Sequence, residues 1–129
     1  MNQKRKGTNA ERELIKIFWE HGWACMRSAG SGSTQYPSPD ILAGNSIRKI
    51  GIECKLSSSP NKYFSKEEIK QLINFCSYFG AEAWIAVKFK NKSWHLFSTE
   101  DLVETEKGYA LYERLCDLKG LNIKEFFSI

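Results

Sequence analysis

The chain has 129 residues, of which 42% are hydrophobic and 26% are charged, so it has the length of one domain and the composition of a globular protein. Its 19 Lys and Arg residues exceed its 15 Asp and Glu residues and give a net charge of +4. These values exclude a disordered chain and a fibrous repeat. No apolar run approaches the roughly 18 residues of a membrane span, so we expect a soluble, cytoplasmic protein.

Local signals in the first half of the chain predict one helix followed by three strands. The helix should begin near Thr8 or Asn9, both favourable N-caps, and end before Gly22. The strands are expected over residues 23–27, 40–43 and 47–56. Residues 29–39 are rich in Gly, Ser and Pro and predict a loop. That composition suits a mobile segment that closes over a ligand, and it suits a plain flexible connector equally well.

The second half predicts a capped helix and a hairpin. After a loop over residues 57–62, the segment Ser65-Lys66-Glu67-Glu68 has the form of a capping box, and Gly80 is a typical helix end. Two strands are expected over 83–87 and 94–97, and short helical pieces over 99–102 and 122–127. This element order predicts an α/β domain, with a central mixed five-stranded sheet flanked by helices.

Positive charge gathers at the beginning of the chain. Through Ser28, three acids stand against six basic residues, namely Lys4, Arg5, Lys6, Arg12, Lys16 and Arg27. Such a segment can hold a phosphate backbone. Charge alone does not distinguish that role from a solvated lysine-rich tail.

The four cysteines (Cys25, Cys54, Cys76 and Cys116) form no CxxC pair. The first three fall in apolar patterns and are predicted to be small buried side chains. With only two histidines in the chain, a zinc site is not expected.

The stretch from Ile50 to Leu56 carries the strongest chemical signal. Side chains alternate in direction along a strand, so the apolar positions of this stretch should face a core. Gly51, Glu53 and Lys55 should share the opposite face, with open space beside the glycine. Glu53 and Lys55 are therefore expected to be neighbours on one surface.

Asp40 opens the preceding strand directly after Pro39, and hairpin pairing would bring its carboxylate close to that of Glu53. Two converging carboxylates repel each other unless a cation lies between them, and their oxygens suit Mg²⁺. A metal beside Lys55 can promote phosphodiester hydrolysis, because both stabilise charge on the phosphate. Each part alone has an ordinary interpretation: an ion pair at a strand edge, turn chemistry, or, for Glu11, an acid at a helix start. Their joint occurrence favours catalysis.

Pro39-Asp40 followed by Glu53-Cys54-Lys55 resembles the PD-(D/E)xK nuclease motif. More narrowly, the chain resembles the archaeal-type Holliday junction resolvases, the Hjc family. The matching segments are Arg5-Lys6-Gly7, Ala10-Glu11-Arg12-Glu13-Leu14, residues 27–33, residues 39–43 and Ile52-Glu53-Cys54-Lys55. The resemblance covers most of the chain and is specific mainly over the first 56 residues.

This resemblance implies a restriction-endonuclease-like fold and one nuclease domain over residues 1–129, with a basic N-terminal arm at 1–6. It implies a metal-dependent endonuclease that resolves four-way DNA junctions by paired symmetric nicks, leaving 5′-phosphate and 3′-hydroxyl ends. Mg²⁺, with Mn²⁺ as a substitute, would be held by Glu11, Asp40, Glu53 and the backbone carbonyl of Cys54. Catalytic roles fall on Lys55, Ser31 and Glu11. DNA contacts fall on Lys4, Arg5, Lys6, Arg12, Arg27, Ser31 and Ser33.

The resemblance also implies a two-fold homodimer with two active sites. Its interface stays open, because the chain after Leu102 matches poorly. The aromatic residues Trp94, Phe97, Phe126 and Phe127 are candidates for that interface or for ordinary core. A sliding clamp and a branch-migration helicase are candidate partners. Two other functions remain open, namely another PD-(D/E)xK nuclease of restriction or repair type, and a DNA-binding relative without activity.

Overall fold

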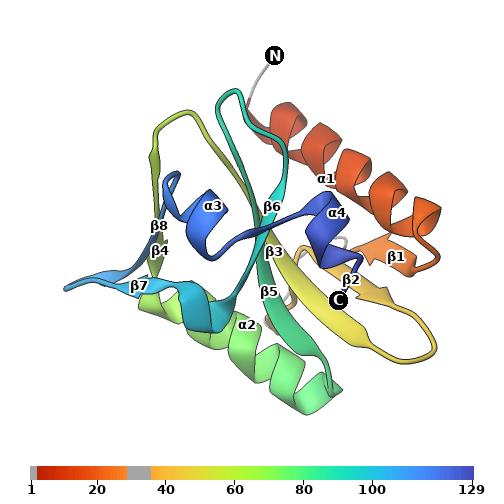
Figure 1. Ribbon diagram of the computed structural model, residues 1–129. Coiled ribbons are helices and arrows are strands. Elements are labelled where there is room, and N and C mark those ends of the chain that lie inside the picture. Colours follow the sequence, from red (N-terminus) through yellow and green to blue (C-terminus); the bar gives the residue numbers. More distant parts are fainter. Residues whose placement is uncertain (1–2, 29–35) are drawn as a thin grey trace.

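The computed structural model describes residues 3–28 and 36–129. In chain order its elements are α1 (Gln3–Glu20), β1 (Ala24–Arg27), β2 (Ile41–Gly44), β3 (Lys49–Ser57), β4 (Asn61–Ser65), α2 (Lys66–Phe79), β5 (Glu82–Phe89), β6 (His95–Ser98), the 3₁₀ helix η1 (Thr99–Asp101), β7 (Val103–Glu104), β8 (Gly108–Tyr112), α3 (Leu115–Leu118), β9 (Leu121–Asn122) and α4 (Ile123–Phe126). Figure 1 shows α1 and α2 as the two long helices beside a central twisted sheet. No helix within the described ranges is both long and apolar enough to cross a membrane.

The central sheet has the strand order β1-β2-β3-β5-β6-β9. Within the described residues, only β3 and β5 of this sheet pair in parallel, and the other neighbours are antiparallel, so the predicted mixed α/β architecture is confirmed. The sheet has six strands rather than the predicted five, because β9 adds two residues to the edge of β6. A strand that short carries no periodic signal of its own.

Side-chain alternation on the central strands separates two cores. On one face, Leu14 and Phe18 of α1 pack with Ile50 and Ile52 of β3, and all four are fully buried. Burying such side chains stabilises the fold by roughly 1.5–3 kcal/mol each. The predicted core positions of the Ile50–Leu56 stretch therefore all lie on the α1 side.

On the opposite face, α2 packs against β5 and against a second sheet of order β4-β8-β7. The capping box predicted at the start of α2 is present: Ser65 Oγ accepts from the Glu68 amide at 3.1 Å, and the Glu68 side chain accepts from the Ser65 amide at 3.4 Å. Gly80 ends the helix with a φ of 80°, in the left-handed region where glycine is favoured.

Gly51 is a point of close approach, and the prediction of open space beside it was wrong. A Cβ atom built there would lie 2.7 Å from Cys76 Sγ on α2 and 3.3 Å from Pro39 Cγ. The glycine lets α2 and the loop before β2 meet directly on the β3 backbone. This contact lies near the end of α2, and the start of the same helix lies next to Lys55 through Glu68.

Two predictions of local structure were wrong. The first helix begins at Gln3 rather than near Thr8 or Asn9, because the residues from Gln3 to Lys6 are good helix formers and Gly7 costs only about 1 kcal/mol inside a helix. Most of the expected arm is thus the first turn of α1.

The second error concerns residues 57–62, predicted as a loop. Asn61–Ser65 forms β4, whose Phe64 pairs with Tyr109 of β8. That partner is distant in sequence, so no local pattern could reveal the pairing.

The aromatic candidates for the dimer interface are mainly core residues. Trp94, Phe97 and Phe126 are at most 1% exposed, and Phe127 packs against Phe18 with ring centroids 4.9 Å apart. Their interpretation as ordinary core is therefore confirmed. All four cysteines are free thiols.

Candidate active site

The register of the β2–β3 hairpin brings Asp40 and Glu53 together, as the sequence predicted. Ile41 pairs with Ile52, so the residue before β2 and the residue after Ile52 lie opposite each other. The Cys54 amide donates to Asp40 Oδ2 at 2.9 Å, and the Ser28 amide donates to the Asp40 backbone carbonyl at 2.8 Å. Asp40 is thus held from both neighbouring strands.

These two carboxyl groups line a small cavity of about 180 Å³. The loop at Pro37–Pro39 forms one wall, and Glu68, Gln71 and Leu72 of α2 form another. A hydrogen bond of 2.8 Å between the hydroxyls of Ser28 and Ser38 ties this loop to the end of β1. The site is therefore built on strand ends and on the first turns of α2.

Burial and crowding change the acidity of both carboxyl groups. Burial, then the nearby Asp40 charge, raises the pKa of Glu53 to about 8. Burial is also the main cause that raises the pKa of Asp40, where the Cys54 hydrogen bond opposes it and the Glu11 charge adds to it. A hydrogen bond joins the two side chains, so a proton stays on the pair to a higher pH than on two separate carboxyl groups.

Lys55 lies beside this pair and contacts two acids. Its Nζ is 3.1 Å from Glu68 Oε1 and 3.8 Å from Glu53 Oε2. Burial lowers the pKa of Lys55, but the charges of Glu68 and Glu53 outweigh burial and raise it overall. The lysine is therefore a held cation at the site rather than a neutral base.

Glu11 reaches the same region from α1, where it is paired with a cation. Arg27 Nε donates to Glu11 Oε1 at 2.7 Å, and the Glu11 side chain is only 17% exposed. Burial raises the pKa of the Cys54 thiol, and the negative charges of Asp40 and Glu11 add to this rise. The Glu11 charge also contributes to the raised pKa of Asp40. Arg27, expected to contact DNA, is thus engaged by Glu11.

The structure describes most of the remaining candidate residues but not all of them. Arg5, Lys6 and Arg12 lie exposed on α1. Lys4 belongs to the first turn of this helix by its backbone. Ser31 and Ser33 lie outside the described residues.

The carboxylate oxygens of Asp40 and Glu53 suit a hard cation whose other ligands are waters or phosphate oxygens. Among residues 3–28 and 36–129, no three His, Cys, Asp or Glu side chains are already gathered as metal ligands. Asp40 and Glu53 nevertheless converge in a small polar cavity, where a cation would relieve their repulsion. Mg²⁺ commonly binds proteins through one or two carboxylates and keeps waters or phosphate oxygens in its other positions.

Glu68 is the site residue that sequence reasoning missed. The capping box was recognised, but Glu68 was assigned only the role of a helix cap. The third residue of α2 also faces β3, where its Oε1 lies 3.1 Å from Lys55 Nζ. Only that tertiary contact gives Glu68 its second role as the partner of Lys55.

Comparison with known proteins places these residues in a family context. The family model described as archaeal Holliday junction resolvase (Hjc) matches residues 2–129. The chain is 42% identical over 122 residues to "Crossover junction endodeoxyribonuclease Hjc" of Archaeoglobus fulgidus, covering 95% of this chain and 89% of the relative. It is 38% identical over 112 residues to the protein of the same name from Methanocaldococcus jannaschii, covering 86% and 79% of the two chains.

The fold agrees with a solved structure from the same group. The Archaeoglobus fulgidus Hjc structure, described as a Holliday junction resolvase, superposes with a TM-score of 0.87 at 39% sequence identity. The match covers 94% of this chain and 99% of the other. This likeness spans the whole described fold rather than the motif alone.

The raised pKa of Glu53 predicts a pH-dependent stability in metal-free protein. A glutamate has an ordinary pKa of 4.5, whereas Glu53 in the folded protein has a pKa of about 8. The contribution of Glu53 to the stability of the folded state is therefore fully present below about pH 4.5 and is lost as the pH rises to about 8. Urea unfolding in EDTA should show that Glu53→Gln gains stability relative to wild type as pH rises across this range. A difference that is independent of pH would contradict the buried carboxyl pair.

Proposed function

The chain belongs to the archaeal Holliday junction resolvase (Hjc) family, and we infer that it is an endodeoxyribonuclease that resolves four-way DNA junctions. The observation that carries this function is the convergence of Asp40, Glu53 and Lys55, in the order of the nuclease motif, within a fold that matches the family from end to end. The products would be paired nicks with 5′-phosphate and 3′-hydroxyl ends.

We propose that Mg²⁺, or Mn²⁺ in its place, is held by Asp40, Glu53 and the backbone carbonyl of Cys54. The Cys54 amide points at Asp40, and the amide and carbonyl of one residue lie on the same side of a strand, which supports a role for this carbonyl. When bound, the metal polarises the phosphate and lowers the pKa of water. Glu11 adds negative charge from the α1 side and keeps Arg27 in place.

Lys55 has the geometry to stabilise charge on the phosphate during attack. Its ammonium group is held by Glu68 and Glu53, so it needs little reorganisation when a phosphate oxygen enters the site. On the family resemblance alone, Ser31 retains its proposed role near the scissile phosphate and Ser33 its proposed DNA contact. The cations of α1, Lys6 and Arg12 among them, would contact backbone phosphates.

The homodimer is also a proposal, and an apolar hollow supports it. A cavity of about 400 Å³ lies along β1 and β2, lined by Trp19, Met26, Leu42 and Phe79 among others. Trp19 is 58% exposed, Met26 59% and Phe79 48%, which is a gathering of large apolar side chains at the edge of a sheet. A second copy related by a two-fold axis would cover this hollow and supply the second active site that paired nicks require.

The first prediction concerns the two acidic residues. Asp40→Asn and Glu53→Gln should bind a synthetic four-way junction as wild type does, because neither change removes a phosphate contact. Their cleavage rate should fall on the order of 10³-fold, since several kcal/mol of transition-state stabilisation is lost. Gel shift and single-turnover cleavage with Mg²⁺ measure the two quantities.

Wild-type protein on the same junction and on a linear duplex made from one arm provides the control. Paired nicks near the crossover with an intact duplex support the resolvase, and EDTA should stop them. Equal cutting of the duplex would favour another nuclease of the superfamily. Binding without any cutting would favour a DNA-binding relative.

A second prediction separates the two roles of Glu68. Ser65→Ala and Glu68→Ala both remove the capping box and should lower stability similarly, by about 1 kcal/mol. Only Glu68→Ala removes the partner of Lys55. We expect its single-turnover cleavage rate to fall about tenfold or more below that of Ser65→Ala, because a misplaced group loses its alignment with the phosphate. Equal cleavage rates in the two variants would show that Glu68 acts only as part of the helix cap.

A third prediction concerns the apolar hollow. Met26→Glu should shift the protein from dimer to monomer in sedimentation velocity, because a buried unpaired carboxylate is costly. Ile47→Glu is the matched control, since Ile47 is 88% exposed and does not line the hollow. A wild-type monomer, or dissociation by both variants, would refute this interface.

A further inference from the structure

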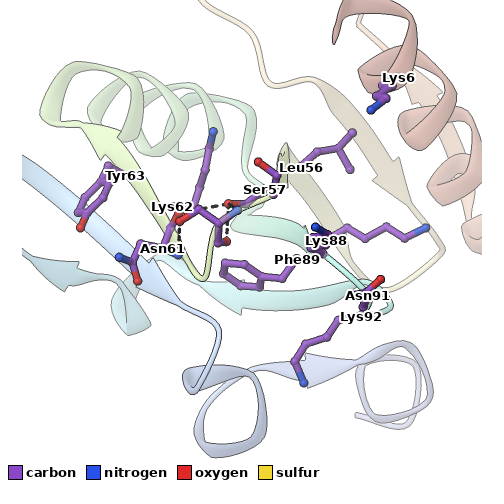
Figure 2. Close-up of a pocket in the computed structure, with 13 residues that line it drawn as sticks. Lys6, Leu56, Ser57, Asn61, Lys62, Tyr63, Lys88, Phe89, Asn91 and Lys92 are labelled. Carbon is purple, nitrogen blue, oxygen red and sulfur yellow. Dashed lines mark hydrogen bonds between the residues drawn. The ribbon is translucent and has the colours of Figure 1, made fainter. Parts of the chain in front are cut away.

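A third cavity, larger than the carboxylate cavity of the active site, forms a groove where β3 and β5 end. It has a volume of about 970 Å³ and is bordered by the start of α1, by β4 and by the turn between β5 and β6 (Figure 2). Five lysines line it, namely Lys6, Lys62, Lys88, Lys90 and Lys92. Figure 2 shows Lys6 on α1, Lys62 on β4 and Lys88 on β5, so separate elements supply the charge.

The lysines of this groove carry a positive charge that the protein only partly neutralises. Within the described residues no Asp or Glu lines the groove. Lys88 pairs with Glu13 at 3.1 Å, and Lys92 lies 3.9 Å from Glu113. Lys6, Lys62 and Lys90 form no ion pair with an acid in the described part of the chain. This excess of positive charge makes the groove suited to a polyanion.

Hydrogen bonds shape the wall of the groove. Ser57 Oγ donates toward the Ser59 carbonyl at 2.8 Å and the Asn61 carbonyl at 3.1 Å, and the Asn61 amide donates to Ser59 Oγ at 3.1 Å. These contacts fold the turn between β3 and β4 back on itself. Lys62 therefore extends from an anchored strand rather than from a loose loop.

The groove begins a short distance along β3 from the catalytic residues. Ser57, which lines it, lies two residues beyond Lys55 on β3, a separation of about 7 Å at roughly 3.3 Å per residue. A DNA backbone with one phosphate beside Lys55 would thus reach the groove within a few nucleotides. The groove lies at the strand ends, whereas the carboxylate cavity lies between β3 and α2.

We propose that this lysine groove binds the sugar–phosphate backbone of a junction arm as it leaves the crossover, at a place separate from the scissile phosphate. This proposal rests on the proposed function and adds Lys62, Lys90 and Lys92 to the DNA-contacting residues. Phosphate contacts of this kind position DNA without reading its sequence. The groove therefore sets affinity and orientation, and the chemistry stays with Asp40, Glu53 and Lys55.

The test compares two variants with the same loss of charge. One replaces Lys62, Lys90 and Lys92 by Gln. The matched control makes the same change at Lys107, Lys119 and Lys124, which are exposed and do not line the groove. Binding of a labelled four-way junction is measured in EDTA over a range of salt concentrations, for junctions with long arms and with arms trimmed close to the crossover.

For long arms, we expect the groove variant to lose about tenfold or more in affinity and its salt slope to fall by about one per lysine, since fewer counterions are released. The control should stay within about twofold of wild type, and trimming the arms should abolish the difference between the variants.

Equal losses in both triple variants would overturn the proposal, because net charge alone would then explain them. An unchanged difference on trimmed arms would also overturn it. If the triple variant does not fold, the single change Lys90→Gln on the exposed turn replaces it, with Lys107→Gln as control. Failure of wild type to cut junctions would refute the proposed function, whereas the groove is judged by binding alone.

Discussion

The crowding of the Asp40 and Glu53 carboxyl groups at one end of the β2–β3 hairpin is the constraint on which the rest of the structure depends. The hairpin register places the two carboxyl groups opposite each other. Burial, together with the nearby Asp40 charge, then raises the pKa of Glu53 to about 8. Such an arrangement is costly without a cation. Fully buried Ile41, Ile50 and Ile52 on the same two strands hold the register and offset that cost.

Helix α2 joins the stability of the fold to the chemistry of the site. Cys76 packs on the bare backbone of Gly51 and brings the helix against β3. Ser65 begins the helix through its capping hydrogen bond, and Glu68 both completes that cap and holds Lys55. The start of α2 thus orders the first turn of the helix and also holds the ammonium group of Lys55. Changes in this turn act on folding and catalysis together.

The protein separates chemistry from backbone binding by using different parts of one strand. The face of β3 that looks toward α2 carries Glu53 and Lys55. The end of the same strand opens into the lysine groove. Because β3 is paired with β5 from Glu53 to Ser57, the two places keep a constant spacing. That spacing suits a substrate recognised by the course of its backbone rather than by its bases.

Local chemistry in the sequence was sufficient to predict the alternation of β3, the capping box at Ser65 and the approach of Asp40 to Glu53, because each depends on neighbours in the chain or on one short hairpin. The family resemblance added Glu11 and the identity of the reaction. Only the tertiary structure decided that Glu11 binds Arg27, that Glu68 holds Lys55, and that Lys62 and Lys90 border one groove. It also decided the pairing of Phe64 with Tyr109. These contacts join residues far apart in the chain, and their free energy comes from packing that no local pattern records.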